Sequence, residues 1–95
     1  MPSNSQPSND KIENVRLALE DYRFKWRTIE GVAQQTQLPV PQVLEAIRAL
    51  ISDGVVIRSG IPSADGRDLY ATRVHYKRFS TFGDRIAAAF RNRAD

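Results

Sequence analysis

The sequence offers few side chains for covalent or metal chemistry. His75 is its only histidine and it contains no cysteine, so neither a Cys–His pair nor a thiolate or multi-histidine metal site can be built. Ser59 and Ser63 have no identifiable base partner other than His75, and no glycine-rich phosphate-binding loop occurs. We therefore expect no catalytic residue, no metal site and no cofactor.

Basic side chains can also serve a function by binding anionic groups, and their excess over acidic side chains lies near the C-terminus. The net charge is +3. Residues 1–71 contain eight Lys or Arg and nine Asp or Glu, whereas residues 72–95 contain six and two. A basic segment suits contact with phosphate groups, but a surplus of this size is also common among soluble proteins. Both interpretations stay open at this point.

The composition is that of one small soluble domain. The chain has 95 residues, of which 41% are hydrophobic and 26% charged, and this is enough for one modest core. The absence of cysteine gives no sign of an oxidising compartment. Neither a secretory signal nor an apolar stretch of about 20 residues occurs. We therefore expect a cytoplasmic protein without a membrane segment.

Residues 1–8 are rich in Pro and Ser and predict a disordered leader. Apolar residues then recur at spacings of three and four, which predicts an amphipathic helix. Asn9 or Asp10 can cap its N-terminus. Its buried face is expected to contain Ile12, Val15, Ala18, Leu19 and Tyr22.

Two further helices are predicted next, joined by a short turn. Thr28 can cap the first of them, which is expected to end near Gln35 or Thr36. Pro41 is compatible with the first turn of the second helix, and Gly54 can end that helix in a left-handed conformation. The apolar stripe of the second helix consists of Val43, Leu44, Ile47, Leu50 and Ile51.

Short strands are predicted around these helices. The segment Phe24–Arg27 alternates aromatic and basic residues, which is the period of a strand. Residues 55–58 and 68–72 are rich in strand formers and are separated by turn formers, which predicts a hairpin with a long tip. We expect Phe24, Trp26 and Tyr70 to pack in the core and not to stack on unpaired bases. His75 is expected at the surface or at the base of the hairpin.

A final helix is predicted from Ser80 or Thr81, either of which can cap it. Its apolar face is too large to leave in water. The helix can form the contact of a homodimer or fold back onto the first helix of the same chain, and the sequence leaves both open. The apolar residues are Phe79, Phe82, Ile86, Ala89 and Phe90.

The run WRTIEGVAQQTQLPVPQVLEAIRALISDGVVIRS, from Trp26 to Ser59, resembles winged helix-turn-helix domains of the bacterial small-module type. The run GRDLYATRVHY, from Gly66 to Tyr76, is similar to the returning strand of their wing. The resemblance covers about residues 10–78. It implies an α+β, mainly α fold with three helices, a short strand and a hairpin wing in residues 9–78, followed by a C-terminal helix and tail in residues 79–95.

The resemblance also implies a function, which is nucleic-acid binding, most often to double-stranded DNA, as in transcription regulation. Some winged helices bind only proteins, so a protein-interaction module is the alternative. In this fold the second helix of the pair enters the major groove. On its outer face Gln42 can pair with adenine, Glu45 can accept from cytosine, and Arg48 can reach guanine or phosphate.

Phosphate contacts are expected from side chains outside this helix: Lys25, Arg27, Thr28, Arg58, Arg67, Arg73, Lys77 and Arg78. The helix itself is a weak electrostatic partner for DNA. Residues 40–53 contain one Arg against Glu45 and Asp53, which is a net charge of −1. DNA binding would therefore depend mainly on the basic residues around the helix.

Overall fold

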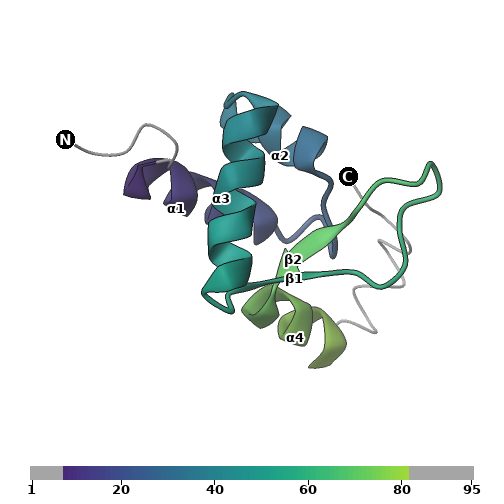
Figure 1. Ribbon diagram of the computed structural model, residues 1–95. Coiled ribbons are helices and arrows are strands. Elements are labelled where there is room, and N and C mark those ends of the chain that lie inside the picture. Colours follow the sequence, from purple (N-terminus) through teal and green to yellow (C-terminus); the bar gives the residue numbers. More distant parts are fainter. Residues whose placement is uncertain (1–7, 82–95) are drawn as a thin grey trace.

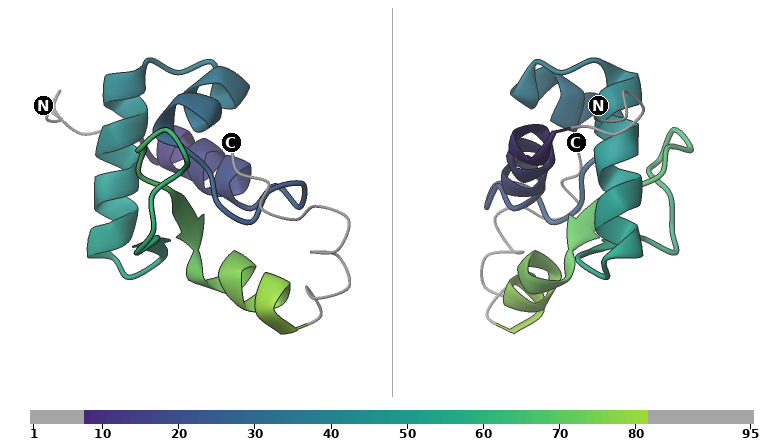
Figure 2. Two further views of the ribbon diagram at one scale, coloured as in Figure 1. Left: turned by 90° about the vertical axis from the view of Figure 1, so that its right-hand side faces the viewer. Right: turned by 60° about the vertical axis from the view of Figure 1, so that its left-hand side comes forward.

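The computed structural model describes residues 8–81. Three helices are followed by a two-stranded antiparallel sheet and a fourth helix, α4, which lies at the end of the domain opposite α2 (Figures 1 and 2). Within residues 8–81 no helix has the length and apolar character needed to cross a membrane. The elements are α1 (Asn9–Leu19), α2 (Ile29–Thr36), α3 (Val40–Ser52), β1 (Val56–Arg58), β2 (Tyr70–Thr72) and α4 (Arg73–Thr81).

The predicted first helix is present, but its cap is Ser8. The Ser8 hydroxyl accepts a hydrogen bond from the Lys11 backbone N–H at 3.3 Å, so neither Asn9 nor Asp10 has the capping role. Val15, Ala18 and Leu19 are buried as predicted. Tyr22 is instead 73% exposed, because α1 ends at Leu19 and the helical period does not extend to it.

The helix pair forms as its sequence predicts. The Thr28 hydroxyl accepts a hydrogen bond from the backbone N–H of Gly31 at 3.0 Å and caps α2. Gln37 ends α2 in the left-handed conformation with φ of 60°. Pro41 lies in the first turn of α3, where its missing N–H has no partner to lose. Gly54 follows α3 with φ of 78°, which a glycine adopts without steric cost.

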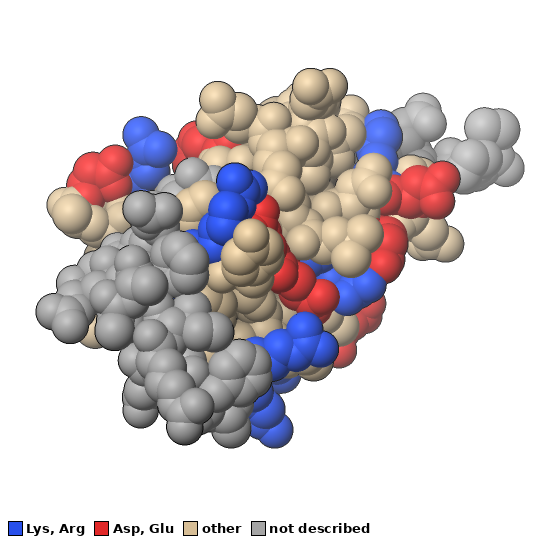
Figure 3. Space-filling model, turned by 180° about the vertical axis from the view of Figure 1, so that it is seen from behind, with Lys and Arg blue, Asp and Glu red and all other residues tan. Residues whose placement is uncertain are grey.

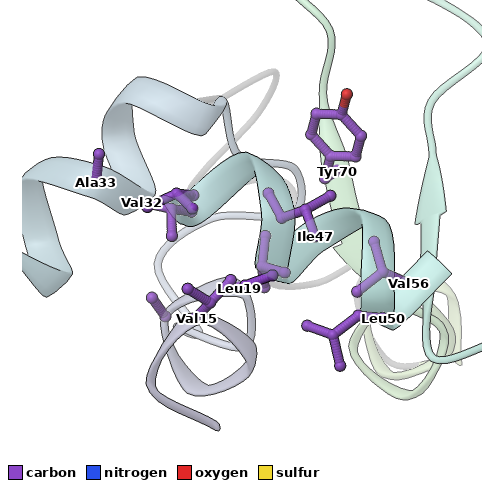
Figure 4. Close-up of a cluster of buried hydrophobic side chains, with 11 residues drawn as sticks. Val15, Leu19, Val32, Ala33, Ile47, Leu50, Val56 and Tyr70 are labelled. Carbon is purple, nitrogen blue, oxygen red and sulfur yellow. The ribbon is translucent and has the colours of Figure 1, made fainter. Parts of the chain in front are cut away.

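The core lies between the first three helices and the base of the hairpin (Figure 4). Each large aliphatic side chain buried there contributes about 1.5–3 kcal/mol of hydrophobic stabilisation. The buried cluster consists of Val15, Ala18 and Leu19 from α1, Val32 and Ala33 from α2, Val43, Ala46, Ile47 and Leu50 from α3, and Val56 and Tyr70 from the hairpin.

The hairpin pairs Val56 with Thr72 and Arg58 with Tyr70. The strand predicted at Phe24–Arg27 is reduced to a single bridge, in which the backbone groups of Arg27 and Tyr70 exchange hydrogen bonds of 2.9 and 2.8 Å. Its length is limited because a turn precedes it and Thr28 caps α2 directly after it. The bridge nevertheless fastens the segment before the helix pair to the base of the wing.

The last described helix begins earlier than predicted. Residues from Arg73 onward are helical directly after β2, and the Thr72 hydroxyl accepts the His75 backbone N–H at 3.1 Å, as a helix cap does. Ser80 and Thr81 therefore lie at the end of α4 and do not start a helix there. The other apolar residues of the predicted final helix, Phe82, Ile86, Ala89 and Phe90, lie outside the described residues.

Candidate nucleic-acid interface

The outer face of α3 is the first part of the candidate interface. Its inner side is buried, with Val43, Ala46, Ile47 and Leu50 in the core, so the opposite side presents Pro41, Glu45, Arg48 and Ser52 to solvent. This face is rotated relative to the prediction because Ala46 faces the core, whereas Ile51 is 42% exposed. Helices α1 and α3 pack against each other, and Ala46 is fully buried in the core cluster that both helices contribute to.

Gln42 does not belong to the centre of this face. Its side chain is half-buried, and its Oε1 atom is buried without a hydrogen-bond partner in the described part of the chain. Because this oxygen is buried, it is not accessible to an adenine edge in this conformation. Of the three side chains expected to recognise bases, Glu45 and Arg48 are exposed together on α3 and Gln42 is not.

The wing, residues 59–69, is ordered by its own hydrogen bonds. Backbone N–H groups of Ser59 and Ser63 donate to the carbonyls of Leu69 and Arg67 at 2.8 and 2.9 Å. The Ser63 hydroxyl accepts the Arg67 backbone N–H at 3.0 Å and donates to the Asp65 carboxylate. Gly66 turns the tip with φ of 86°. The wing therefore projects beside α3 as a preformed loop (Figure 2).

Acidic side chains accompany the arginines of this surface. Arg58 lies 3.9 Å from Asp68, while Arg67 lies 3.1 Å from Asp65 and 3.9 Å from Glu30 in the first turn of α2. The pKa of Asp65 is lowered, mainly because the Ser63 hydroxyl donates to it and also because Arg67 is near. The exposed ion pair between Arg67 and Glu30 connects the wing to α2, but it contributes little stability.

The charges of Arg48 and Arg58 both act on the Tyr70 hydroxyl. Burial raises the pKa of the Tyr70 hydroxyl, the Asp68 charge raises it further, and the charges of Arg58 and Arg48 act in the opposite direction. We refer to the exposed charged residues of α2, α3 and the wing as the α3–wing face: Arg48, Arg58 and Arg67 against Glu30, Glu45, Asp65 and Asp68. Three positive and four negative charges give this face a net charge of −1.

Two side chains that were expected to contact phosphate, those of Arg27 and Thr28, are buried in the structure. Arg27 is only 3% exposed, and its guanidinium donates to the carbonyls of Ala18 and Gly31 at 3.0 and 3.2 Å and to the Gln35 amide oxygen. Thr28 is 4% exposed, and its hydroxyl is engaged as the cap of α2. Their side chains connect α1, α2 and the bridge to the hairpin, so they are not available to a phosphate in this fold.

The other basic candidates lie at the α4 end of the domain, away from the tip of the wing (Figure 1). Arg73 donates from Nε to the Gly54 carbonyl at 2.7 Å and so joins α4 to the end of α3. The Lys25 ammonium lies 5.4 Å from the centre of the Tyr76 ring. Lys77 and Arg78 are exposed on α4. The structure thus divides the predicted basic residues between two surfaces.

His75 has a structural position that the sequence did not reveal. It is 3% exposed, bonded through Nε2 to the Phe24 carbonyl, and packed edge-on against Phe79 at 4.9 Å between ring centres. It lies near the base of the hairpin but not at the surface. Its position three residues after a capping threonine was the signal that could have placed it on a helix. Among residues 8–81 no group of three His, Cys, Asp or Glu could hold a metal ion.

The structure is similar to that of a MarR family regulator from Neisseria meningitidis, with a TM-score of 0.58 and 16% sequence identity. The similarity covers 87% of this chain and 63% of that protein, so the chain spans less than two thirds of the regulator's length. No known protein family matches the sequence, and no curated protein sequence matches it. At this identity the likeness shows the fold alone, and it confirms that the chain forms the predicted winged helix-turn-helix with a further helix after the wing.

Proposed function

We propose that the domain binds double-stranded DNA with the α3–wing face, as a module of transcription regulation. The observation that carries this proposal is the exposed outer side of α3 with an ordered wing beside it, which is the arrangement that a helix-turn-helix needs to enter the major groove. The structural neighbour is a regulator, which is consistent with this proposal.

Each side chain has a role that follows from its position. Arg48 and Glu45, exposed on α3, contact base edges. Arg58, at the end of β1, and Arg67, on the wing, contact phosphate groups. Phosphate would have to exchange with Asp68, Asp65 and Glu30 for these arginines. We therefore expect weak binding to random sequence, with discrimination that depends on α3.

The test is a fluorescence-anisotropy titration of a random duplex at about 50 mM and about 200 mM salt. The two arginines at phosphates, Arg58 and Arg67, predict a slope of log K against log salt of about −1.8, which is a loss of about 12-fold over this range. Arg58→Gln should weaken binding and reduce the slope by about 0.9. Arg16→Gln is the matched control, because Arg16 lies on α1 and pairs with Glu13 and Glu20.

The role of α3 is tested with a preferred duplex selected from a random pool. Arg48→Ala should reduce the preference for that duplex by about 1–3 kcal/mol and affect random duplex less. The contributions of Lys25, Arg73, Lys77 and Arg78 to duplex binding stay predictions of the sequence. The double substitution Lys77→Glu and Arg78→Glu in the same titration would measure the contribution of α4.

A protein-interaction module is the second candidate, and the charge balance of the α3–wing face favours it. The face has a net charge of −1, and it carries apolar side chains, with Ile61 of the wing 77% exposed and Ile51 of α3 42% exposed. Absence of duplex binding at 50 mM salt, roughly the regime where phosphate contacts are strongest, would exclude the first candidate and leave this one.

A homodimer through the C-terminal segment also stays a prediction. Phe79 packs on His75, while Phe82, Ile86 and Phe90 lie outside the described residues. A symmetric dimer would match the paired half-sites that helix-turn-helix proteins commonly bind. Sedimentation equilibrium tests it: a dimer predicts a concentration-dependent mass that Phe90→Asp abolishes while the fold persists, whereas a monomeric wild type excludes it.

A further inference from the structure

A second surface combines aromatic and basic side chains at the α4 end of the domain. The ring centres of Trp26 and Tyr76 are 5.5 Å apart, and their planes are tilted by 49°. The Lys25 ammonium lies 5.4 Å from the centre of the Tyr76 ring. Tyr76 is 37% exposed although two neighbours pack against it. We call Lys25, Trp26, Arg73, Tyr76 and Lys77 the α4 surface.

The segments that contribute the α4 surface are basic. Residues 22–28 and 73–81 contain six Lys or Arg and no Asp or Glu, and of the six only Arg27 is buried. The adjacent Asp21 is paired with Arg23 at 2.7 Å, and Arg73 bonds the Gly54 carbonyl, next to Asp53. Figure 3 shows Lys and Arg side chains along the lower edge of the molecule, on the side where α4 lies in Figure 1. The α3–wing face, in contrast, has a net charge of −1.

The placement of these residues brings a ring and cations together. Helical spacing puts Arg73 and Lys77 on the same side of α4 as Tyr76, and Lys25 reaches the ring from the loop before α2. The ring packs against Trp26, so little side-chain freedom remains to be lost when a base stacks on its exposed part. A rigid exposed ring with cations around it is suited to one class of ligand.

We propose that the α4 surface binds single-stranded nucleic acid, with an unpaired base stacked on Tyr76 and the adjoining phosphates at Lys25 and Lys77. Stacking on an aromatic ring and neutralisation of the backbone are the two contributions that such binding needs. A duplex does not satisfy this geometry, because its bases are already stacked and paired. The inference does not rest on the α3–wing face, since Tyr76 and Trp26 have no role in the duplex-binding proposal.

The experiment titrates the full chain with labelled 12-nucleotide oligo(dT) and oligo(U), a length of roughly one small binding site. Trp26 is the only tryptophan, so its intrinsic fluorescence reports on the surface directly. Binding of either strand with a change in Trp26 fluorescence is expected. The ratio of the two Kd values identifies whether DNA or RNA is the better strand, because only RNA offers the 2′-hydroxyl.

Substitutions assign the binding to this surface. Tyr76→Leu should weaken binding about 5- to 150-fold. Lys77→Gln should reduce the salt slope by about 0.7. Tyr22→Leu is the matched control, because Tyr22 is a 73% exposed aromatic residue that lies near Lys25 and Trp26 in the sequence. This substitution should leave single-strand binding unchanged.

Circular dichroism checks that each variant is folded. If Tyr76→Leu fails to fold, the double variant Lys25→Gln and Lys77→Gln takes its place. Absence of single-strand binding at low salt would overturn the inference, as would binding that persists in both Tyr76→Leu and the double lysine variant. Loss of single-strand binding in Arg58→Gln alone would assign it to the α3–wing face. Duplex titrations on the same variants report separately on the duplex-binding proposal.

Discussion

The substitution Arg27→Met tests whether Arg27 has a structural role, in contrast to the arginines that are proposed to bind DNA. The Arg27 guanidinium is buried, donates to the backbone carbonyls of Ala18 and Gly31, and lies 4.5 Å from the centre of the Phe24 ring. Methionine preserves much of the volume and the contact with Phe24 but removes every donor. The variant therefore measures what the hydrogen bonds of the guanidinium contribute to folding.

The magnitude follows from those bonds. Hydrogen bonds to a charged group contribute about 1.5–3 kcal/mol each, so the two to backbone carbonyls give about 3–6 kcal/mol. Removing the buried cation also removes its desolvation cost, which returns part of this amount. After the substitution, the Ala18 carbonyl still accepts a weaker hydrogen bond from the Asp21 N–H at 3.3 Å. We expect a net loss of about 2–3 kcal/mol, which lowers Tm by about 10 °C or more.

Urea and thermal unfolding followed by circular dichroism provide the assay. Arg58→Met is the matched control, because its side chain is 63% exposed and its distance to Asp68 is 3.9 Å, and it should change stability by less than about 0.5 kcal/mol. Under conditions where both variants are folded, only Arg58→Met should weaken duplex binding. Equal unfolding midpoints for the two variants would refute the structural role of Arg27.

Three further predictions concern the local structure. The pKa of Asp21 is lowered to about 2, mainly by the hydrogen bond from Arg23. This pair therefore stabilises the fold above the ordinary carboxyl pKa, and the stabilisation is lost as the pH falls toward 2. Asp21→Asn should lower the Tm at pH 7, and the difference in Tm from the wild type should shrink on acidification. Gly54→Ala should cost about 1 kcal/mol because φ is positive there, whereas Gly60→Ala, where a Cβ also meets nothing within 4 Å and no positive φ occurs, should be neutral or slightly stabilising in the same urea titration. Thr28→Ala should cost about 1 kcal/mol by removing the α2 cap, and Thr28→Ser should restore most of it in thermal melts.

Local chemistry was enough to predict the helix pair and the wing. A capping threonine, a proline in the first turn and a terminating glycine are short-range signals, and the structure uses Thr28, Pro41 and Gly54 in those roles. The start of α4 was missed because Thr72 has two roles, the last residue of β2 and the cap of the next helix. Overlapping signals of this kind cannot be separated by period alone.

The candidate site was harder to predict than the fold, because exposure depends on contacts between distant parts of the chain. Arg27 has the side-chain chemistry of a phosphate ligand, and only its contact with Ala18, nine residues earlier, shows that it is interior. His75 bonds a carbonyl 51 residues away in sequence, at Phe24. Neither contact has a local sequence signature, so the sequence predicted a phosphate contact for Arg27 and could not distinguish the surface from the base of the hairpin for His75.

Ion pairing also depends on contacts between distant parts of the chain, and it influences the local charge of each surface. The sequence places its basic excess in the last quarter, but Arg67 of the wing pairs with Glu30 at the start of α2, 37 positions earlier. That ion pair belongs to the α3–wing face. In contrast, residues 22–28, before α2, and residues 73–81, in α4, contain no Asp or Glu. Because an anionic ligand responds to the local charge and less to the total, the two surfaces should differ in salt dependence even though they belong to one chain with a net charge of +3.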